Sequence, residues 1–148
     1  MPRVDRNALR FNQACIVAGV VAAFVLGDGP GRWLILAVAA VMLAGTAWEP
    51  LSLFKQVYRH GAVRLGLLRP RPVDEDPTPH RFAQGLGGTF LLGSFLALLL
   101  SAPLVGWALA WLVVALALVN LLFGFCAGCF LYFQLERAGL LPRSAEAR

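Results

Sequence analysis

Apolar residues fill long stretches of the chain, and charged residues are confined to the segments between them. No Asp, Glu, Lys or Arg occurs from Phe82 to Leu135. Because a membrane-crossing helix needs about 20 apolar residues, this stretch has room for two crossings. Two shorter uncharged runs, 11–27 and 33–48, add one crossing each. The pattern predicts an all-α integral membrane protein with four transmembrane helices.

The segment between the second and third crossings has a different pattern. Apolar residues at positions 51, 54, 57, 58, 61, 62, 65 and 68 fall on one side of a helix, and Lys55, Arg59 and Arg64 lie off that stripe. This is typical of a basic amphipathic helix lying in the membrane surface. Residues 69–79 are rich in proline and are expected to form an extended linker.

The two predicted pairs of crossings begin with similar residues. Four residues recur at an offset of 71, namely Asp5, Arg10, Phe11 and Gln13 with Asp76, Arg81, Phe82 and Gln84. Each set lies immediately before a crossing, which predicts a parallel repeat of two helical hairpins pointing the same way. We therefore expect one membrane domain over residues 1–148. It would comprise a first hairpin (5–48), the interfacial helix and linker (50–80), a second hairpin (81–135) and a tail (136–148).

The distribution of basic residues predicts the orientation. The chain carries a net charge of +5, and of its 13 Lys and Arg residues only Arg32 lies in a connection on the opposite side. Short loops rich in Lys and Arg stay in the cytoplasm, so we expect a bacterial inner-membrane protein with both termini cytoplasmic. The charge then reflects contact with anionic headgroups. Nucleic acid is not expected as a partner, because no basic surface is interleaved with stacking aromatic residues.

The main chemical feature is the pair Cys126 and Cys129. On a continuous fourth helix the two thiols would share one face. That helix should leave the hydrocarbon near Gly124, which places both thiols at the cytoplasmic interface. A Cys-x-x-Cys pair in a reducing compartment indicates catalysis or metal binding rather than a permanent disulfide. The alternative is that both cysteines are small packing residues beside Gly124 and Gly128.

The repeat would bring further polar residues to the depth of the thiols. Arg10 and Arg81 are candidates for stabilising a thiolate or a bound anion, and Gln13 and Gln84 add amide groups there. A helix C-terminus disfavours a nearby thiolate, so the arginines would have to lie within roughly 6 Å of the thiols. The alternative is that both arginines anchor helix starts at the headgroups.

Other kinds of site find less support in the sequence. Cys15, Cys126, Cys129 and His80 could supply four metal ligands, but His80 lies on the proline-rich linker and no second ligand pair exists. No metal or other cofactor is therefore expected, and Cys15 is interpreted as a packing residue. The crossings contain no carboxylate, so a proton-coupled transporter would lack its usual relay.

Three segments together resemble a known family. They are Asp5 with Arg10-Phe11-Asn12-Gln13, then Pro79-His80-Arg81-Phe82-Ala83-Gln84, and finally Phe123-Gly124-Phe125-Cys126-Ala127-Gly128-Cys129. The chain resembles, over almost its whole length, a bacterial membrane family catalogued as domain of unknown function 4395. The resemblance implies a small multi-helix membrane protein without an established activity. It also implies an association with rhodanese-like and thioredoxin-like proteins, which favours thiol or sulfur handling.

The leading functional hypothesis is a cytoplasm-facing membrane thiol protein. It would carry out redox exchange or handle persulfide sulfur through Cys126 and Cys129, with Arg10 and Arg81 stabilising charge. Its expected partners are the lipid bilayer and a soluble thioredoxin-like or rhodanese-like protein. Two alternatives remain open: a small-solute or sulfur-anion transporter acting as a homo-oligomer, and a structural membrane subunit without chemistry.

Overall fold

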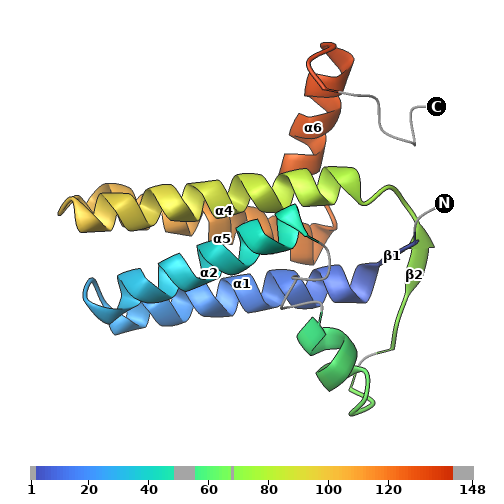
Figure 1. The fold of residues 1–148 in the computed structure, drawn as a ribbon, viewed down its shortest axis with the longest axis horizontal. Coiled ribbons are helices and arrows are strands. Elements are labelled where there is room, and N and C mark those ends of the chain that lie inside the picture. Colours follow the sequence, from blue (N-terminus) through green and yellow to red (C-terminus); the bar gives the residue numbers. More distant parts are fainter. Residues whose placement is uncertain (1–2, 49–55, 68, 142–148) are drawn as a thin grey trace.

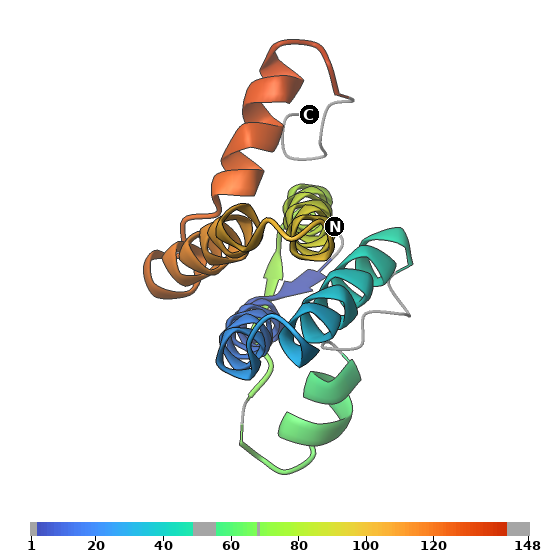
Figure 2. The same ribbon diagram turned by 90° about the vertical axis from the view of Figure 1, so that its left-hand side faces the viewer.

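Four long helices lie side by side and form the body of the molecule (Figures 1 and 2). The computed structural model describes residues 3–48, 56–67 and 69–141. The long helices are α1 (Arg6–Leu26), α2 (Pro30–Ala47), α4 (Thr78–Leu99) and α5 (Pro103–Phe123). The shorter elements are β1 (Arg3–Asp5), η2 (Tyr58–Ala62), β2 (Pro72–Asp74) and α6 (Ala127–Arg137). Helix α2 packs between α1 and α4, and α5 packs against both α1 and α4.

The predicted all-α fold with four apolar helices is confirmed. Within the residues described, four helices are long and apolar enough to cross a membrane, and they are α1, α2, α4 and α5. Their ends follow local signals in the sequence. Helices α2, α4 and α5 each have a proline in the first turn, where a missing N–H costs nothing. Helix α5 ends because Gly124 adopts a left-handed conformation with φ of 69°.

The core of the bundle consists of aliphatic side chains, and its outer surface is apolar as well. Ile16, Ile35 and Leu91 are almost completely buried between the helices. On the outside, Leu104 is 84% exposed and Phe123 is 80% exposed. A surface with so much contiguous apolar area suits lipid rather than water.

A carboxylate accepts backbone hydrogen bonds at the start of α1, and another does so at the start of α4. The Asp5 carboxylate accepts hydrogen bonds from the N–H groups of Asn7 (2.9 Å) and Ala8 (3.3 Å) at the start of α1. The Asp76 carboxylate accepts from the Thr78 N–H (2.9 Å) at the start of α4. The two helices begin at the same end of the bundle and run in the same direction (Figure 1). Capping of this kind satisfies N–H groups that have no partner within the helix.

The proline-rich segment is not a free linker, because part of it pairs with the start of the chain. Strands β1 and β2 are antiparallel, with Val4 opposite Val73 and Asp5 opposite Pro72. The Arg71 N–H also donates to the Asp5 carboxylate (3.0 Å), and the Arg71 carbonyl accepts from the Arg6 N–H (3.1 Å). These contacts fasten residues 71–74 to the start of α1. They also bring the residues after β2 to the end of the bundle where α1 and α4 begin.

The predicted interfacial helix over residues 51–68 falls partly outside the described residues, which omit 49–55 and 68. Within the described part the chain is helical from residue 56 to Ala62 and then turns, with Gly66 in a left-handed conformation. The helix is therefore shorter than expected at its end. Tyr58 and Ala62 are buried against Ala8 of α1, so this segment packs on the bundle.

The chain does not continue as one helix past Gly124. Helix α6 is a separate element that projects sideways from the end of the bundle (Figures 1 and 2). It packs on the first turns of α4, where the Tyr132 ring lies 5.5 Å from the Phe82 ring. Gly128 allows this approach, since a Cβ there would lie 2.5 Å from the Ala83 Cβ. Of the two glycines expected to form a packing pair, only Gly128 does so, and Gly124 instead ends α5.

Candidate functional site: a cysteine pair beside a histidine

Cys126 and Cys129 lie at the start of α6, and the expectation that they lie at the end of the fourth membrane helix is wrong. Gly124 breaks that helix, and Cys126 becomes the N-cap of the next one, with φ of −94° and ψ of 103°. Its sulfur accepts a hydrogen bond from the Cys129 N–H (3.2 Å). A helix N-terminus carries partial positive charge and unpaired N–H groups, so this position favours a thiolate. Cys126 thus lies at a helix N-terminus, whereas the sequence predicted a helix C-terminus at this position.

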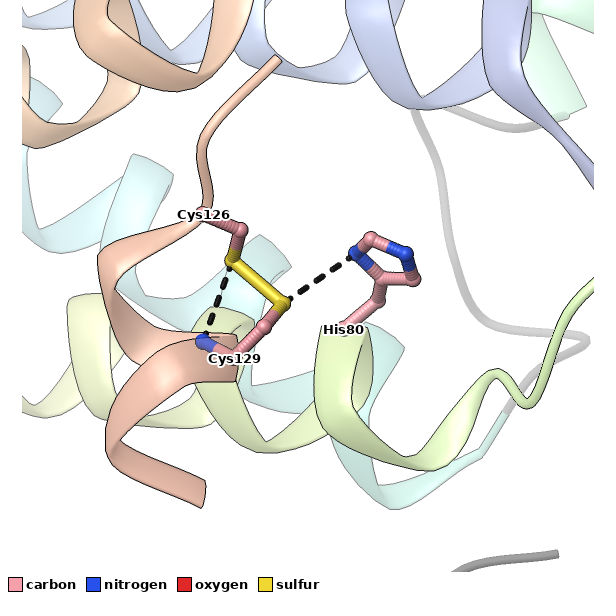
Figure 3. Close-up of side chains that lie close together, drawn as sticks. All are labelled: His80, Cys126 and Cys129. Atoms are coloured by element: carbon pink, nitrogen blue, oxygen red, sulfur yellow. Dashed lines mark hydrogen bonds between the residues drawn. A yellow bond between two sulfur atoms is a disulfide. The ribbon is translucent and has the colours of Figure 1, made fainter. Parts of the chain in front are cut away.

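The two cysteines are joined as a disulfide (Figure 3). Their Cα atoms lie 5.1 Å apart, within the normal range for such a bond. Cys129 is buried against the start of α4, and Cys126 is more accessible. The pair is therefore asymmetric, because Cys126 is partly exposed and Cys129 is buried.

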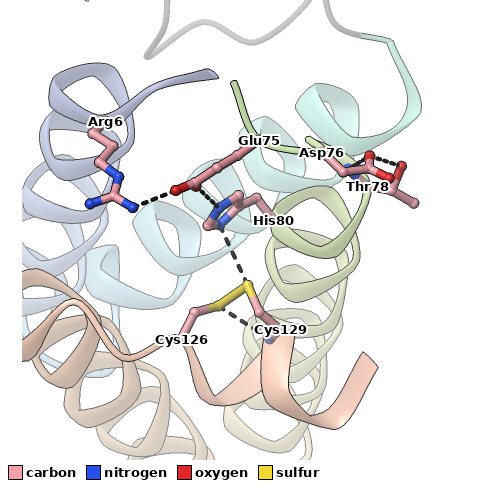
Figure 4. Close-up of polar contacts among 7 residues, drawn as sticks. All are labelled: Arg6, Glu75, Asp76, Thr78, His80, Cys126 and Cys129. Atoms are coloured by element: carbon pink, nitrogen blue, oxygen red, sulfur yellow. Dashed lines mark hydrogen bonds and ion pairs between the residues drawn. A yellow bond between two sulfur atoms is a disulfide. The ribbon is translucent and has the colours of Figure 1, made fainter. Parts of the chain in front are cut away.

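The buried sulfur contacts a histidine from another helix. The Nδ1 atom of His80, in the first turn of α4, lies 3.4 Å from the Cys129 sulfur. The Nε2 atom of His80 lies 3.8 Å from the Glu75 carboxylate, which also forms an ion pair with Arg6. The four side chains form a row from Arg6 at the surface to the disulfide (Figure 4). Glu75 can orient the imidazole ring, so His80 is placed to give a proton to the Cys129 sulfur when the disulfide opens.

An open cleft of about 370 Å³ lies over the disulfide. Arg6, Glu75 and His80 contribute polar groups to its lining, and three aromatic side chains contribute apolar surface. These aromatic residues are Phe125, Phe130 and Phe133. A space of this size can admit part of another molecule to the sulfur atoms.

A second, smaller cavity of about 70 Å³ lies inside the bundle. Side-chain amides of Asn12, Gln13, Gln84 and Asn120 line it together with Cys126 and apolar residues. Asn12 is 2% exposed, and its Oδ1 atom has no hydrogen-bond partner among the residues that the structure describes. Cys126 lines both cavities and so lies between the outer cleft and the bundle interior.

The predicted polar residues lie in different places. Gln13 and Gln84 line the same inner cavity as Cys126, and the Gln84 amide donates to the Met42 carbonyl (3.1 Å). The Arg81 guanidinium instead donates to the Thr46 carbonyl (2.7 Å), which ties α4 to the end of α2. Successive residues of a helix point about 100° apart, so His80 can face α6 while Arg81 faces α2.

The remaining candidates lie on α1. Arg10 is exposed on the surface of that helix. Cys15 is a free, half-buried cysteine on the same helix. The structure therefore brings His80, and neither predicted arginine, into hydrogen-bonding distance of the cysteine pair.

Sequence reasoning missed the row Arg6, Glu75 and His80 as a unit. In the sequence, His80 stands out as a possible metal ligand and as part of the family motif, and Glu75 lies in the proline-rich linker. Their association depends on the pairing of β1 with β2, and strands of three residues leave little pattern in a sequence. The available signal was the position of His80 one residue before the repeated Arg81, at the start of a membrane helix.

The fold and site define a class: a protein of four apolar helices with a Cys-x-x-Cys pair at a short helix placed across their end. Within this class the chain matches a family model described as Domain of unknown function (DUF4395), over residues 4–137. It belongs to that family, which confirms the resemblance noted from its motifs. Neither the curated proteins nor the solved structures include a significant match.

Proposed function

We propose that the protein is a membrane-bound thiol–disulfide exchange protein that works through Cys126 and Cys129. The observation that carries the proposal is the disulfide between these residues, which lines an open cleft and contacts His80 in the wall of that cleft. The asymmetry of the pair assigns the roles. Cys126 exchanges with the substrate because it is more accessible and lies at a helix start. Cys129 is the resolving cysteine, which forms the internal disulfide with Cys126 and leaves as a thiol when that bond is reduced.

The exchange takes two steps with a dithiol substrate. A substrate thiolate attacks the Cys126 sulfur; a mixed disulfide forms, the Cys126–Cys129 bond breaks, and Cys129 leaves as a thiolate that takes a proton from His80. The second substrate thiolate then attacks the substrate sulfur of the mixed disulfide and releases the Cys126 thiolate. The substrate dithiol is oxidised to a disulfide and the protein disulfide is reduced. A disulfide substrate drives the same steps in reverse.

The proposed location is the cytoplasmic face of the inner membrane. Support comes from the basic residues. All of them except Arg32 lie before the first crossing, between the second and third crossings, or after the fourth, and the cysteines lie at that same end of the hairpins. A soluble dithiol protein of thioredoxin-like or rhodanese-like type is the proposed partner, since the family resemblance favours one. The parallel relation of the two hairpins is part of this proposal. It is supported by Asp5 and Asp76, each of which accepts a hydrogen bond from the N–H two residues further on, at the starts of α1 and α4.

Trapping of the mixed disulfide tests the exchange. With Cys129 changed to Ser and the second cysteine of the substrate also changed to Ser, the substrate remains attached to Cys126, because neither protein has a second thiol in place to break the mixed disulfide. We expect the purified Cys129→Ser protein, after activation with a disulfide reagent, to form a stable adduct with such a single-cysteine variant of a dithiol protein. Cys126→Ser should form much less, because its remaining thiol is buried. Equal trapping by both variants would refute the assigned roles, and no trapping by either would refute exchange.

Persulfide formation is a second candidate, favoured by the inner cavity. Its volume of about 70 Å³ suits a molecule of a few atoms beside Cys126, and its polar lining is made of amides. Hydrosulfide could attack the Cys126 sulfur, forming Cys126 persulfide and releasing the Cys129 thiolate, so that sulfide is oxidised as the disulfide is reduced. Mass spectrometry after sulfide treatment should show one added sulfur atom on the Cys126 peptide. Addition only at Cys15 would contradict this candidate.

A further inference from the structure

We propose that, when the disulfide is reduced, Cys126, Cys129 and His80 form a zinc site. The sulfur atoms of both cysteines and a ring nitrogen of His80 all lie within 4.8 Å of one another. Zinc binds thiolates at about 2.3 Å and imidazole at about 2.0–2.1 Å, so tetrahedral ligands lie roughly 3.3–3.8 Å apart. Small side-chain adjustments are enough to reach that geometry once the sulfur–sulfur bond is broken.

The backbone around the cysteines already supports a metal-bound thiolate. The Cys129 N–H points at the Cys126 sulfur (3.2 Å), and Cys126 is the N-cap of α6. Hydrogen bonds and a helix N-terminus both stabilise negative charge on sulfur, which is the form that binds a metal. A Cys-x-x-Cys pair at a helix start therefore presents two thiolates in fixed positions.

The histidine is oriented as a metal ligand would be. Its Nδ1 atom faces the sulfur of Cys129, and its Nε2 atom faces the Glu75 carboxylate. Metal-binding histidines usually donate their second N–H to a carboxylate, which sets the tautomer and the ring orientation. Arg6 in turn pairs with Glu75 and holds the carboxylate in place. This outer layer of contacts distinguishes the cluster from three ligand residues that merely lie close together.

The donor set indicates both the metal and the kind of site. Two thiolates and one imidazole suit Zn²⁺, whereas Mg²⁺ and Ca²⁺ prefer oxygen ligands. The three ligands adjoin the open cleft of about 370 Å³, which leaves the fourth position to water or to a ligand from outside. The sequence predicts no metal site, although it offers Cys15 as a fourth possible ligand. Cys15 is a free cysteine on α1 outside the three-residue cluster.

Zinc binding and disulfide formation use the same sulfur atoms and exclude each other. This inference needs only a reduced pair, and it does not depend on exchange with a protein substrate. A small dithiol reductant, itself oxidised to a disulfide, supplies the two electrons that open the site. Zinc then binds the two thiolates, which lose their protons on binding.

Zinc titration of the full-length protein in detergent tests the proposal. The protein is reduced, freed of reductant without oxygen, and titrated with Zn²⁺ in competition with a chromophoric chelator. We expect about one zinc per chain for the wild type and for the matched control Cys15→Ser, and none for the oxidised protein. Cobalt in place of zinc should give thiolate-to-metal charge-transfer absorption.

Variants distinguish zinc binding at the proposed three-ligand site from nonspecific zinc binding to thiols. His80→Ala and Glu75→Gln should both lower zinc affinity, Glu75→Gln by about 10- to 100-fold, as expected for the loss of an outer partner. Circular dichroism checks that the variants keep their helices. Unchanged affinity in His80→Ala, or no zinc bound by the reduced wild type, would overturn the proposal. Zinc binding without mixed-disulfide trapping would refute only the exchange function, and trapping without zinc would refute only the metal site.

Discussion

Gly124 determines the chemical setting of Cys126. Its left-handed backbone, with φ of 69°, ends α5 two residues before the cysteine. Without that break Cys126 would lie within the last turn of a membrane helix, where exposed carbonyl groups disfavour a thiolate. With it, the sulfur lies at the start of α6 and accepts the Cys129 N–H. The position of one glycine thus reverses the local field at the cysteine.

His80 and Glu75 should control how fast the disulfide is reduced. The Cys129 sulfur leaves more easily when His80 supplies a proton, and Glu75 holds the ring that does so. We expect His80→Ala to slow reduction by a small dithiol about 10-fold or more. Glu75→Gln should slow it less.

Stopped-flow measurement of thiol release follows this reaction, and Arg81→Gln serves as the matched control. Arg81 is the neighbouring residue, but its guanidinium bonds to Thr46 on α2. If Arg81→Gln is reduced as slowly as His80→Ala, then Arg81 also activates the disulfide, and the assignment of this role to His80 is contradicted.

At the scale of elements, the docking of α6 on α4 brings the cysteines to His80. The contact depends on Gly128, which meets Ala83 with no room for a side chain. Gly128→Val should therefore displace α6, destabilise the protein by about 1–3 kcal/mol as overpacking does, and slow disulfide reduction. Gly61→Ala is the control, because a Cβ there meets open space. Thermal unfolding in detergent gives the stability, and a Gly128→Val protein as stable and as reactive as the control would contradict the docking.

The membrane helices were predictable from the sequence, and α6 was not. Long uncharged runs have few ways to fold in a membrane, and the break at Ser101–Pro103 and the stop near Gly124 are local signals. Helix α6 continues the same uncharged run, so composition alone could not separate it from α5. The partner of Cys129 is His80, which contacts Glu75 in turn, and the β1–β2 pairing brings Arg6 of α1 to that carboxylate. The cysteines were identified, but their surroundings depend on these tertiary contacts.

At the scale of the whole molecule, both tyrosines lie buried outside the membrane-spanning helices. Burial raises the pKa of Tyr58 in η2, and the Asp5 carboxylate adds to the shift. Burial also raises the pKa of Tyr132 in α6, and the negative charges of Glu136 and Asp76 raise it further. Both phenols are therefore held neutral in the folded protein, one on each of the short helices attached to the bundle.

These shifts predict a loss of stability at alkaline pH. In the unfolded chain a tyrosine ionises near pH 10, and the folded state resists this ionisation. The stabilisation is fully present below about pH 10 and is lost as the pH rises through the raised folded pKa values. Thermal unfolding should show a decline above about pH 10 that becomes shallower in Tyr58→Phe and in Tyr132→Phe. An unchanged decline in the double variant would show that other groups cause it.

The central claim is that Cys126 and Cys129 are a reversible redox pair at the cytoplasmic face. Thiol labelling in oriented membrane vesicles shows on which side of the membrane the cysteines lie and whether they are reduced. The label is a membrane-impermeant maleimide, and the protein carries Cys15→Ser so that only the pair can react. In inside-out vesicles we expect labelling of the pair, chiefly at Cys126, after treatment with a dithiol, little labelling after an oxidant, and recovery on renewed reduction. Right-side-out vesicles should stay unlabelled under all three conditions. Labelling confined to right-side-out vesicles, or labelling that oxidant and reductant leave unchanged, would contradict the account.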